Sequence, residues 1–178
     1  HQRRAPALAH QCRLRDRRTR EVRIVAGDAG RLEQLRRQVQ ADVAMLDTLQ
    51  NLLVEEINGM VADAAQACGI ALSDIADAVV VGNPTMQHIF LGINPTPLGR
   101  GPYLPVLAAG VEVEAASLGL RIGSGAPVFV LPMPAGYIGG DTLAAVMTRG
   151  PEFYRGNHLL VDIGTNGEVV LAKDGVLT

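Results

Sequence analysis

The residues best suited to chemistry lie near the end of the sequence, in the segment Asp162-Ile163-Gly164-Thr165-Asn166-Gly167-Glu168. A hairpin bend that contains glycines leaves backbone N–H groups unobstructed, and such a nest of N–H groups binds phosphate oxygens. We therefore expect a nucleotide-phosphate site at this bend, formed by Gly164, Thr165, Asn166, Gly167 and Glu168. Asp162 ends the preceding strand and is suited to hold Mg²⁺ through water, because Mg²⁺ keeps several waters and takes few protein ligands.

A second carboxylate, Asp141, begins a run of small residues that reads as a helix. It is expected either to join Asp162 in the catalytic site or to cap its own helix, since aspartate is a common helix cap. The bend itself has a plainer interpretation, because an Asn-Gly pair between two apolar runs is also a strong signal for an ordinary hairpin turn.

Other motifs are missing or isolated. The sequence contains neither a Gly-x-x-x-x-Gly-Lys-Ser/Thr loop nor a Gly-x-Gly-x-x-Gly loop, which argues against P-loop and Rossmann nucleotide sites. His88 has no second metal ligand at a suitable spacing, so a packed or half-exposed histidine is expected there. The two cysteines, Cys12 and Cys68, are too few for a four-thiolate iron–sulfur cluster.

The elements that must position this site follow from apolar periodicity. A stripe with steps of three and four predicts a long amphipathic helix that ends at Gly69, with a break near residues 47–51. The stripe consists of Leu32, Leu35, Val39, Val43, Leu46, Gln50, Leu53, Ile57, Met60, Ala64 and Cys68.

After this helix, short strands and helices alternate. A β-branched run at 78–82 predicts a buried strand, and Asn83-Pro84 is a favourable start for a helix over 85–91. Further strands are expected at 127–131, 159–163, 168–172 and from 176 onward, with a strand and a helical turn within 111–120 and a helix at 141–147.

Composition sets outer limits. The chain has 178 residues and is 48% hydrophobic, which fits one domain with a real core. No apolar run approaches the ~18–20 residues of a membrane helix, so we expect no membrane partner and a cytoplasmic protein. Eight arginines fall within residues 1–23, but no lysine or aromatic residue accompanies them, so a solvated or non-native tail is favoured over nucleic-acid binding.

Three blocks in the same order resemble the reductive activators of corrinoid-dependent enzymes, a family of the actin-like ATPase superfamily. The blocks are Val79-Val80-Val81-Gly82-Asn83-Pro84-Thr85-Met86-Gln87-His88 with 91–99, then 136–145, then 160–168. The resemblance covers roughly residues 29–178 and implies an incomplete α/β fold of the actin-like, RNase H-like class. It divides the chain into an irregular basic segment (1–28), the latter part of a first subdomain (29–158) and the first hairpin of a second (159–178).

The resemblance also implies a function. Members of the family hydrolyse ATP with Mg²⁺ and return cobalt(II) corrinoids to cobalt(I), with a corrinoid protein or cobalamin-dependent methyltransferase as partner. An upstream phosphate loop, a downstream adenosine segment and an iron–sulfur cluster would all lie outside this chain, so the chain alone is expected to be inactive. Two alternatives stay open: part of a sugar- or acetate-kinase-like phosphotransferase, and a non-catalytic structural module.

Overall fold

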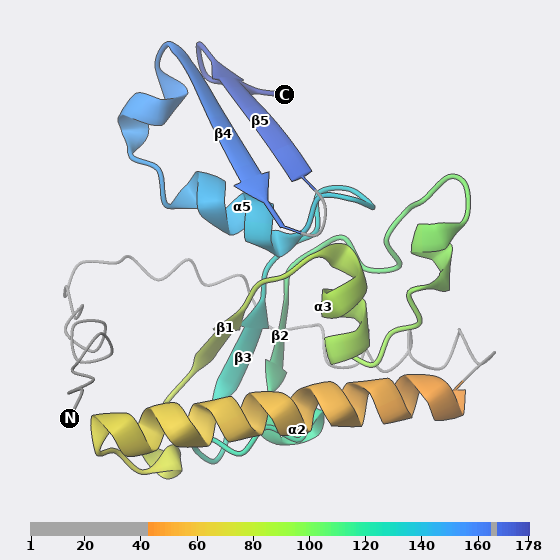
Figure 1. Cartoon of the computed structure of the whole chain (residues 1–178), viewed down its shortest axis with the longest axis vertical. Coiled ribbons are helices and arrows are strands. Elements are labelled where there is room, and N and C mark those ends of the chain that lie inside the picture. The colour runs from red at the N-terminus through yellow and green to blue at the C-terminus, as the bar shows by residue number, and fades with distance from the viewer. Residues whose placement is uncertain (1–42, 165–166) are drawn as a thin grey trace, which may run out of the picture.

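The computed structural model describes residues 43–164 and 167–178, and these form two parts, each built around a small β-sheet (Figure 1). The expected basic segment 1–28 and the first residues of the long helix lie outside the described residues. The structure has the element order α2 (Val43–Cys68), η2 (Leu72–Asp74), β1 (Ala78–Val80), α3 (Pro84–Phe90), η3 (Thr96–Gly99), β2 (Val111–Glu114), α4 (Ala115–Leu118), β3 (Pro127–Val130), α5 (Gly140–Met147), η4 (Pro151–Tyr154), β4 (Asn157–Ile163), β5 (Gly167–Lys173) and β6 (Val176–Leu177), where η marks a 3₁₀ helix.

In the first sheet, β3 lies between the other two strands, parallel to β1 and antiparallel to β2. Side chains alternate between the two faces of a strand, and β2 follows this rule, with buried valines and exposed glutamates in turn. The register sets Val111 opposite Val130 and Val113 opposite Val128, so these four buried residues share one face. This face forms the centre of the larger core.

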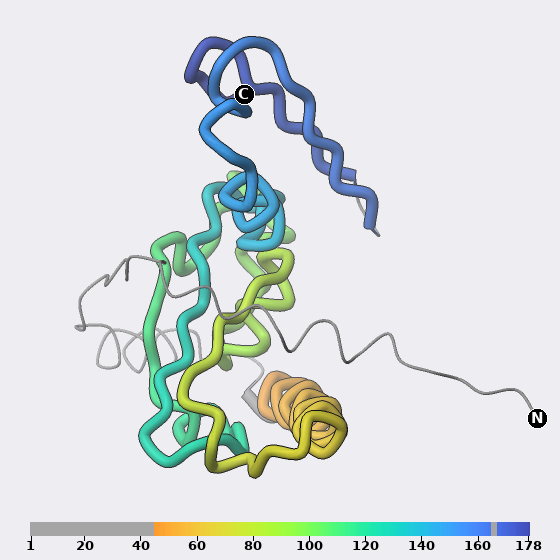
Figure 2. Tube along the Cα trace, turned by 90° about the vertical axis from the view of Figure 1, so that its left-hand side faces the viewer, coloured from red at the N-terminus to blue at the C-terminus, as the bar shows by residue number. Residues whose placement is uncertain are grey.

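Helices α2 and α3 lie on the same side of this sheet (Figure 2). Val54 of α2 and both Phe90 and Leu91 of α3 pack with the strand valines in one buried cluster. The expectation of a buried strand at 78–82 was only half right, because β1 is an edge strand and the described helices cover one face of the sheet. Val79 points away from that face and is 65% exposed.

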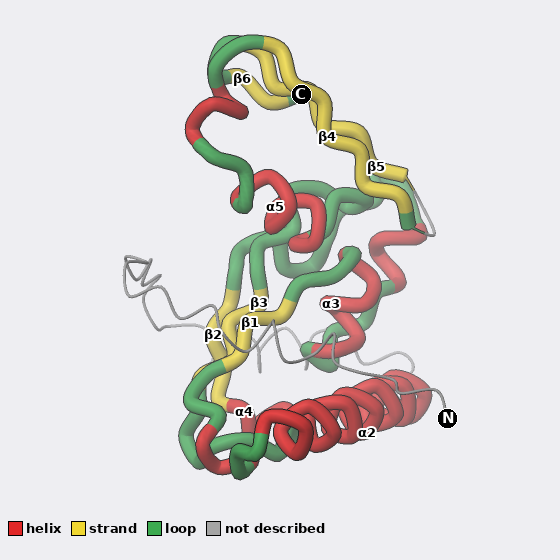
Figure 3. The backbone as a smooth tube through the Cα atoms, turned by 60° about the vertical axis from the view of Figure 1, so that its left-hand side comes forward, coloured by secondary structure: helices red, strands yellow, loops and turns green. Residues whose placement is uncertain are grey.

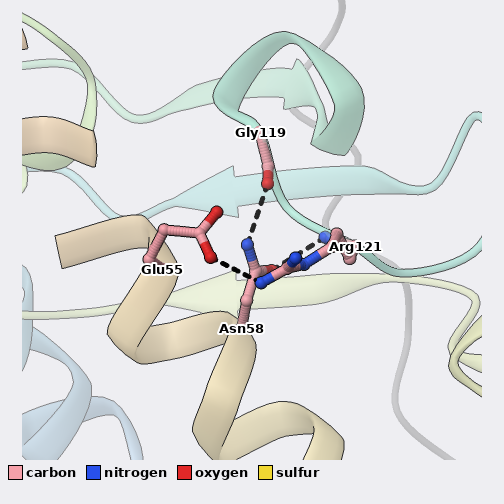
Figure 4. Close-up of polar contacts among 4 residues, drawn as sticks. All are labelled: Glu55, Asn58, Gly119 and Arg121. Carbon is pink, nitrogen blue, oxygen red and sulfur yellow. Dashed lines mark hydrogen bonds and ion pairs between the residues drawn. The ribbon is translucent and has the colours of Figure 1, made fainter. Parts of the chain in front are cut away.

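Helix α2 is a single helix of 26 residues, so the expected break near residues 47–51 was wrong. The buried stripe also departs from the apolar pattern. Met60 is exposed, whereas Asn58 is buried. The Asn58 side chain forms hydrogen bonds with two backbone groups: Nδ2 donates to the Gly119 carbonyl and Oδ1 accepts from the Arg121 N–H (Figure 4). Among the described residues, no helix combines the length and the apolar character that crossing a membrane requires.

The start of α3 matches the prediction. Asn83 Oδ1 accepts a hydrogen bond from the Met86 N–H at 2.9 Å, and Pro84 occupies the first turn. A cap of this kind satisfies one of the helix N–H groups that have no partner inside the helix. The side chains that follow in this short helix are therefore held in a fixed orientation.

The second sheet is an antiparallel meander of β4, β5 and β6, and α5 lies between it and the first sheet (Figures 1 and 3). Its inner face packs on α5 and η4 through a small cluster of Val146, Phe153 and Ala172, with Leu160 and Val170 at the margin. The opposite face carries exposed apolar side chains, namely Leu159, Val161, Ile163, Val169 and Leu171.

Candidate functional site

The predicted phosphate bend lies at the end of the β4–β5 hairpin. Ile163 ends β4 directly opposite Gly167, which begins β5. Gly164 and Gly167 are both exposed. Thr165 and Asn166, the tip of the bend, lie outside the described residues.

The register of the hairpin brings two predicted site residues together. Asp162 of β4 lies directly opposite Glu168 of β5, and both side chains are half-buried on the inner face of the sheet. Two like charges placed opposite each other destabilise a sheet. Within residues 43–164 and 167–178, no lysine or arginine forms an ion pair with either carboxylate. The pair is thus a suitable ligand set for a hydrated cation.

Asp141 lies in the first turn of α5, not at its cap. The N-cap residue is Gly139, which has no side chain to donate or accept, so the capping alternative was wrong in its strict form. Asp141 Oδ1 instead accepts a hydrogen bond from the N–H of its neighbour Thr142 at 2.8 Å. A carboxylate in the first turn also interacts favourably with the helix dipole.

A cavity of about 390 Å³ separates the hairpin from the start of α5. Gly167 and Glu168 line it from the hairpin and Thr142 lines it from α5, together with Tyr137, Ile138, Val169 and Val170. The Thr142 hydroxyl is buried and has no hydrogen-bond partner among the described residues. Neither Asp141 nor Asp162 belongs to the lining of this cavity.

A larger cavity, of about 660 Å³, lies beside the N-terminal end of α3 and shares Tyr137 with the first. Its lining contains one charged residue, Arg100, and the first residues of α3, Pro84, Thr85 and Met86. The Tyr137 ring lies 5.8 Å from the ring of Tyr103. Tyr137 therefore stands at the boundary between the two cavities, with Tyr103 beside it.

Three glycines let the loop before α5 approach its neighbours closely. A Cβ atom at Gly136 would lie 1.8 Å from the Tyr103 carbonyl oxygen, and one at Gly139 would lie 2.2 Å from the Gly82 carbonyl oxygen. A Cβ atom at Gly140 would lie 2.9 Å from Gln87 Nε2. All three distances are shorter than a carbon atom tolerates, so this corner of the site requires glycine.

His88 is fully buried, as the packed alternative predicted, and it joins α3 to the loop before β2. Its Nδ1 lies 2.6 Å from the Pro84 carbonyl oxygen, and its Nε2 accepts the Val106 N–H at 3.1 Å. Because Nε2 must accept, the proton of the neutral ring lies on Nδ1, which donates to Pro84. Burial lowers the pKa of His88, and the hydrogen bond to Pro84 only partly opposes that shift. His158, expected at the surface, is exposed.

Sequence reasoning missed Gln87, whose buried amide joins α3 to both ends of the loop that leads into α5. The signal was present, because a glutamine between Met86 and His88 in a short apolar helix needs partners if it is buried. The described residues contain no group of three or more His, Cys, Asp or Glu residues that could hold a metal ion. The Asp162–Glu168 pair would therefore leave most ligand positions to water or to phosphate oxygens.

Comparison with known proteins extends this picture. Residues 34–152 match the family described as the RACo middle region. The chain is 29% identical over 128 residues to the corrinoid activation enzyme RamQ of Eubacterium limosum, a match that covers 72% of this chain and 21% of that protein. A solved structure, the reductive activator for corrinoid,iron-sulfur protein, superposes with a TM-score of 0.72 at 28% identity, covering 82% of this chain and 23% of that one.

These matches confirm the expected actin-like α/β class and the resemblance to the reductive activators of corrinoid-dependent enzymes. The chain spans between a fifth and a quarter of the length of these two relatives. With the match to residues 34–152, it belongs to the RACo middle region family, the family of reductive activators of corrinoid proteins.

Proposed function

We propose that this chain is the nucleotide-binding part of an ATP-dependent reductive activator, which returns the cobalt(II) corrinoid of a partner protein to cobalt(I). The proposed partner is a corrinoid protein or a cobalamin-dependent methyltransferase, and the electron would come from an iron–sulfur cluster outside these residues. Support comes from the two relatives, whose names describe corrinoid activation. They favour this function over a sugar- or acetate-kinase-like one.

The observation that carries the proposal is the end of the hairpin. Glycines border the bend, an acidic pair on the inner face of the sheet forms no ion pair with a lysine or arginine of the described residues, and a cavity of about 390 Å³ opens between the hairpin and α5. Mg²⁺, when bound with ATP, neutralises phosphate charge and orients the phosphate groups. In this site Asp162 would hold the metal through water, and Gly164 and Gly167 would offer N–H groups to phosphate, with Thr165, Asn166 and Glu168 adjoining them.

The chemistry assigned to the chain's own residues is binding and orientation. The hairpin would fix the phosphate chain, and Asp141 lies next to Thr142, which lines the cavity from α5, so it would act from the margin of the site as a second carboxylate. Holding both sets of groups on regular elements preorganises the site, so little reorganisation is needed when the nucleotide binds.

The test begins with the purified 178-residue chain, which should show no ATP turnover; measurable turnover would contradict the expectation that it acts only as a part. Isothermal titration of Mg-ATP into the longest native polypeptide that carries these residues should give saturable binding. Asp162→Ala should weaken that affinity by about 10–100-fold, the usual effect of losing a group that supports a metal.

The matched control is Asp77→Ala, which removes an exposed aspartate just before β1. That variant should bind Mg-ATP as the wild type does. Equal affinity in the wild type and in Asp162→Ala would count against the metal role. If the polypeptide binds Mg-ATP saturably but ATP does not affect its reduction of a corrinoid protein, the nucleotide site would be supported and the proposed activation function would be contradicted.

A further inference from the structure

A single buried side chain joins the two halves of the candidate site. Gln87 lies in α3 and is 1% exposed. Its Nε2 donates to the Leu131 carbonyl oxygen at 2.9 Å, and its Oε1 accepts from the Gly140 N–H at 2.9 Å. Leu131 follows β3 and Gly140 begins α5, so one amide holds both ends of the loop 131–140.

This amide seats the first turn of α5 directly against α3. A Cβ atom at Gly140 would lie 2.9 Å from Gln87 Nε2 and equally close to the Leu131 Cβ. One residue earlier, Gly139 lets the chain approach the Gly82 carbonyl oxygen, which accepts the Asp141 N–H at 3.5 Å. The start of α5 is therefore packed closely on Gln87, Leu131 and Gly82.

The chemistry of the amide makes the arrangement specific. An amide offers one donor and one acceptor end, and Leu131 O and Gly140 N–H require one of each. Leu131 and Gly140 are both buried, so a backbone group that loses Gln87 would leave a buried polar group without its partner. Loss of the amide should therefore weaken the attachment of the start of α5.

We infer that Gln87 is a positioning residue for the first turn of α5, which carries Asp141 and Thr142: through Gly140 and Leu131 it fixes this turn against α3, beside the cavity that the hairpin also lines. This inference rests on the proposed function, because it assigns Gln87 a consequence for Mg-ATP binding. It also makes α3, which borders the larger cavity, the element against which the acidic residue of α5 is placed.

The decisive variant is Gln87→Glu, because it should make the attachment of α5 depend on pH. A protonated glutamic acid reproduces both hydrogen bonds, since its hydroxyl donates to Leu131 O and its carbonyl oxygen accepts from Gly140. The ionised form only accepts hydrogen bonds and repels Leu131 O. Gln50→Glu is the matched control, because the Gln50 amide also donates to a backbone carbonyl, that of Phe90, away from α5.

Affinity for Mg-ATP is to be measured by titration at several pH values in the longest native polypeptide that carries these residues, with amide hydrogen exchange at Gly140 followed in parallel. In Gln87→Glu we expect wild-type affinity at the acidic end of the range, and a loss of about tenfold toward the alkaline end, the effect typical of groups that support a binding residue. Wild type and Gln50→Glu should share one shallow pH profile. Exchange at Gly140 should rise with the affinity loss.

The outcomes separate the two claims. A wild type that does not bind Mg-ATP refutes the proposed function and this inference with it. A wild type that binds, with a Gln87→Glu profile parallel to that of Gln50→Glu, refutes the positioning role alone. If circular dichroism shows that Gln87→Glu unfolds at alkaline pH, Gln87→Met replaces it in the experiment. This apolar variant of similar size should bind Mg-ATP more weakly than the wild type at every pH. Wild-type affinity in Gln87→Met would overturn the inference.

Discussion

The two sheets of this chain are both built from largely apolar strands but are buried to different degrees. Sheet β1-β3-β2 lies against α2 and α3, and its inward valines at 111, 128 and 130 are almost completely buried. Sheet β4-β5-β6 meets one short helix and one 3₁₀ turn, and Ile163 on its other face remains 87% exposed. The first part therefore carries its own core, whereas the second relies on a small cluster around Phe153.

This difference matters because the candidate phosphate bend belongs to the less buried part. The hairpin touches the rest of the described structure chiefly through α5 and η4. Regions with few buried apolar contacts open at lower free energy than the core of the same protein. The geometry of the bend should thus depend on contacts made by α5, more than on the long helix or the first sheet.

The strongest test of the comparison truncates one phenylalanine in each core. Phe90→Ala should lower the free energy of unfolding by about 3–5 kcal/mol, the usual cost of emptying a buried aromatic site. Phe153→Ala should instead speed hydrogen exchange in β4 and β5 while β1, β2 and β3 keep their protection. Exchange measured residue by residue checks both. Simultaneous loss of protection in the two sheets after Phe153→Ala would show that they unfold as one unit.

A second test asks whether the larger core depends on its buried polar contact. Asn58→Ala should cost about 1–3 kcal/mol in urea unfolding, because the Gly119 carbonyl and the Arg121 N–H both lose their partner. The control is Glu55→Gln, which removes the exposed ion pair to Arg121 and should cost less than about 1 kcal/mol. If both variants lose the same free energy of unfolding, the Glu55–Arg121 ion pair would hold the turn after α4 as strongly as the Asn58 hydrogen bonds do.

A third test uses pH to weaken the first part alone. His88 is held neutral by burial, so its pKa in the folded chain lies below the ordinary value of about 6.5. Above that value neither state is protonated and stability is unaffected. Below it the unfolded chain takes up a proton that the fold resists, so stability falls with pH, by at most about 1.4 kcal/mol per pH unit.

Urea titrations between neutral and mildly acidic pH measure this slope. His88→Gln should flatten it, and His158→Gln, at an exposed position of the second part, should leave it unchanged. An unchanged slope in His88→Gln would assign the acid sensitivity to another group.

The smallest effect is expected on the outer face of the hairpin. Val161→Lys should alter the free energy of unfolding by no more than about 0.5 kcal/mol, as for most surface substitutions. It should also reduce self-association, measured by sedimentation velocity, because it interrupts an exposed apolar row. Val170→Lys, on the inner face beside Phe153, is the control and should open the hairpin. Comparable destabilisation by both lysines would mean that the outer face is covered in solution.

The sequence predicted well whatever depends on local rules. Asn83-Pro84 set the start of α3, the run of small residues from Asp141 located α5 to within one residue, and the apolar runs located the strands. It failed where a distant partner decides. Asn58 is buried by carbonyl and N–H groups some sixty positions away, which shifted the stripe of α2 off Met60. Val79 was expected to be buried because it stands in a β-branched apolar run, although it lies on the face of an edge strand that no described helix covers.

The site shows the same division. The hairpin itself was expected, but its register, which sets Asp162 opposite Glu168, was not predicted from the sequence. The role of Gln87 in seating α5 could not be predicted, since it depends on a carbonyl 44 residues away and an N–H 53 residues away. Whether the bend binds phosphate stays a prediction.

The glycines at 136, 139 and 140 limit which substitutions this loop can accept during evolution. Every missense change in a glycine codon introduces at least a methyl group, and at these three positions that methyl would collide with a carbonyl oxygen or a buried amide. Selection should therefore remove almost all substitutions at these three positions. The exposed Gly99 should accept substitution, because a Cβ atom there would have no neighbour within 4 Å. In a saturation library scored for folded protein, we expect almost no accepted substitutions at positions 136, 139 and 140 and many at position 99.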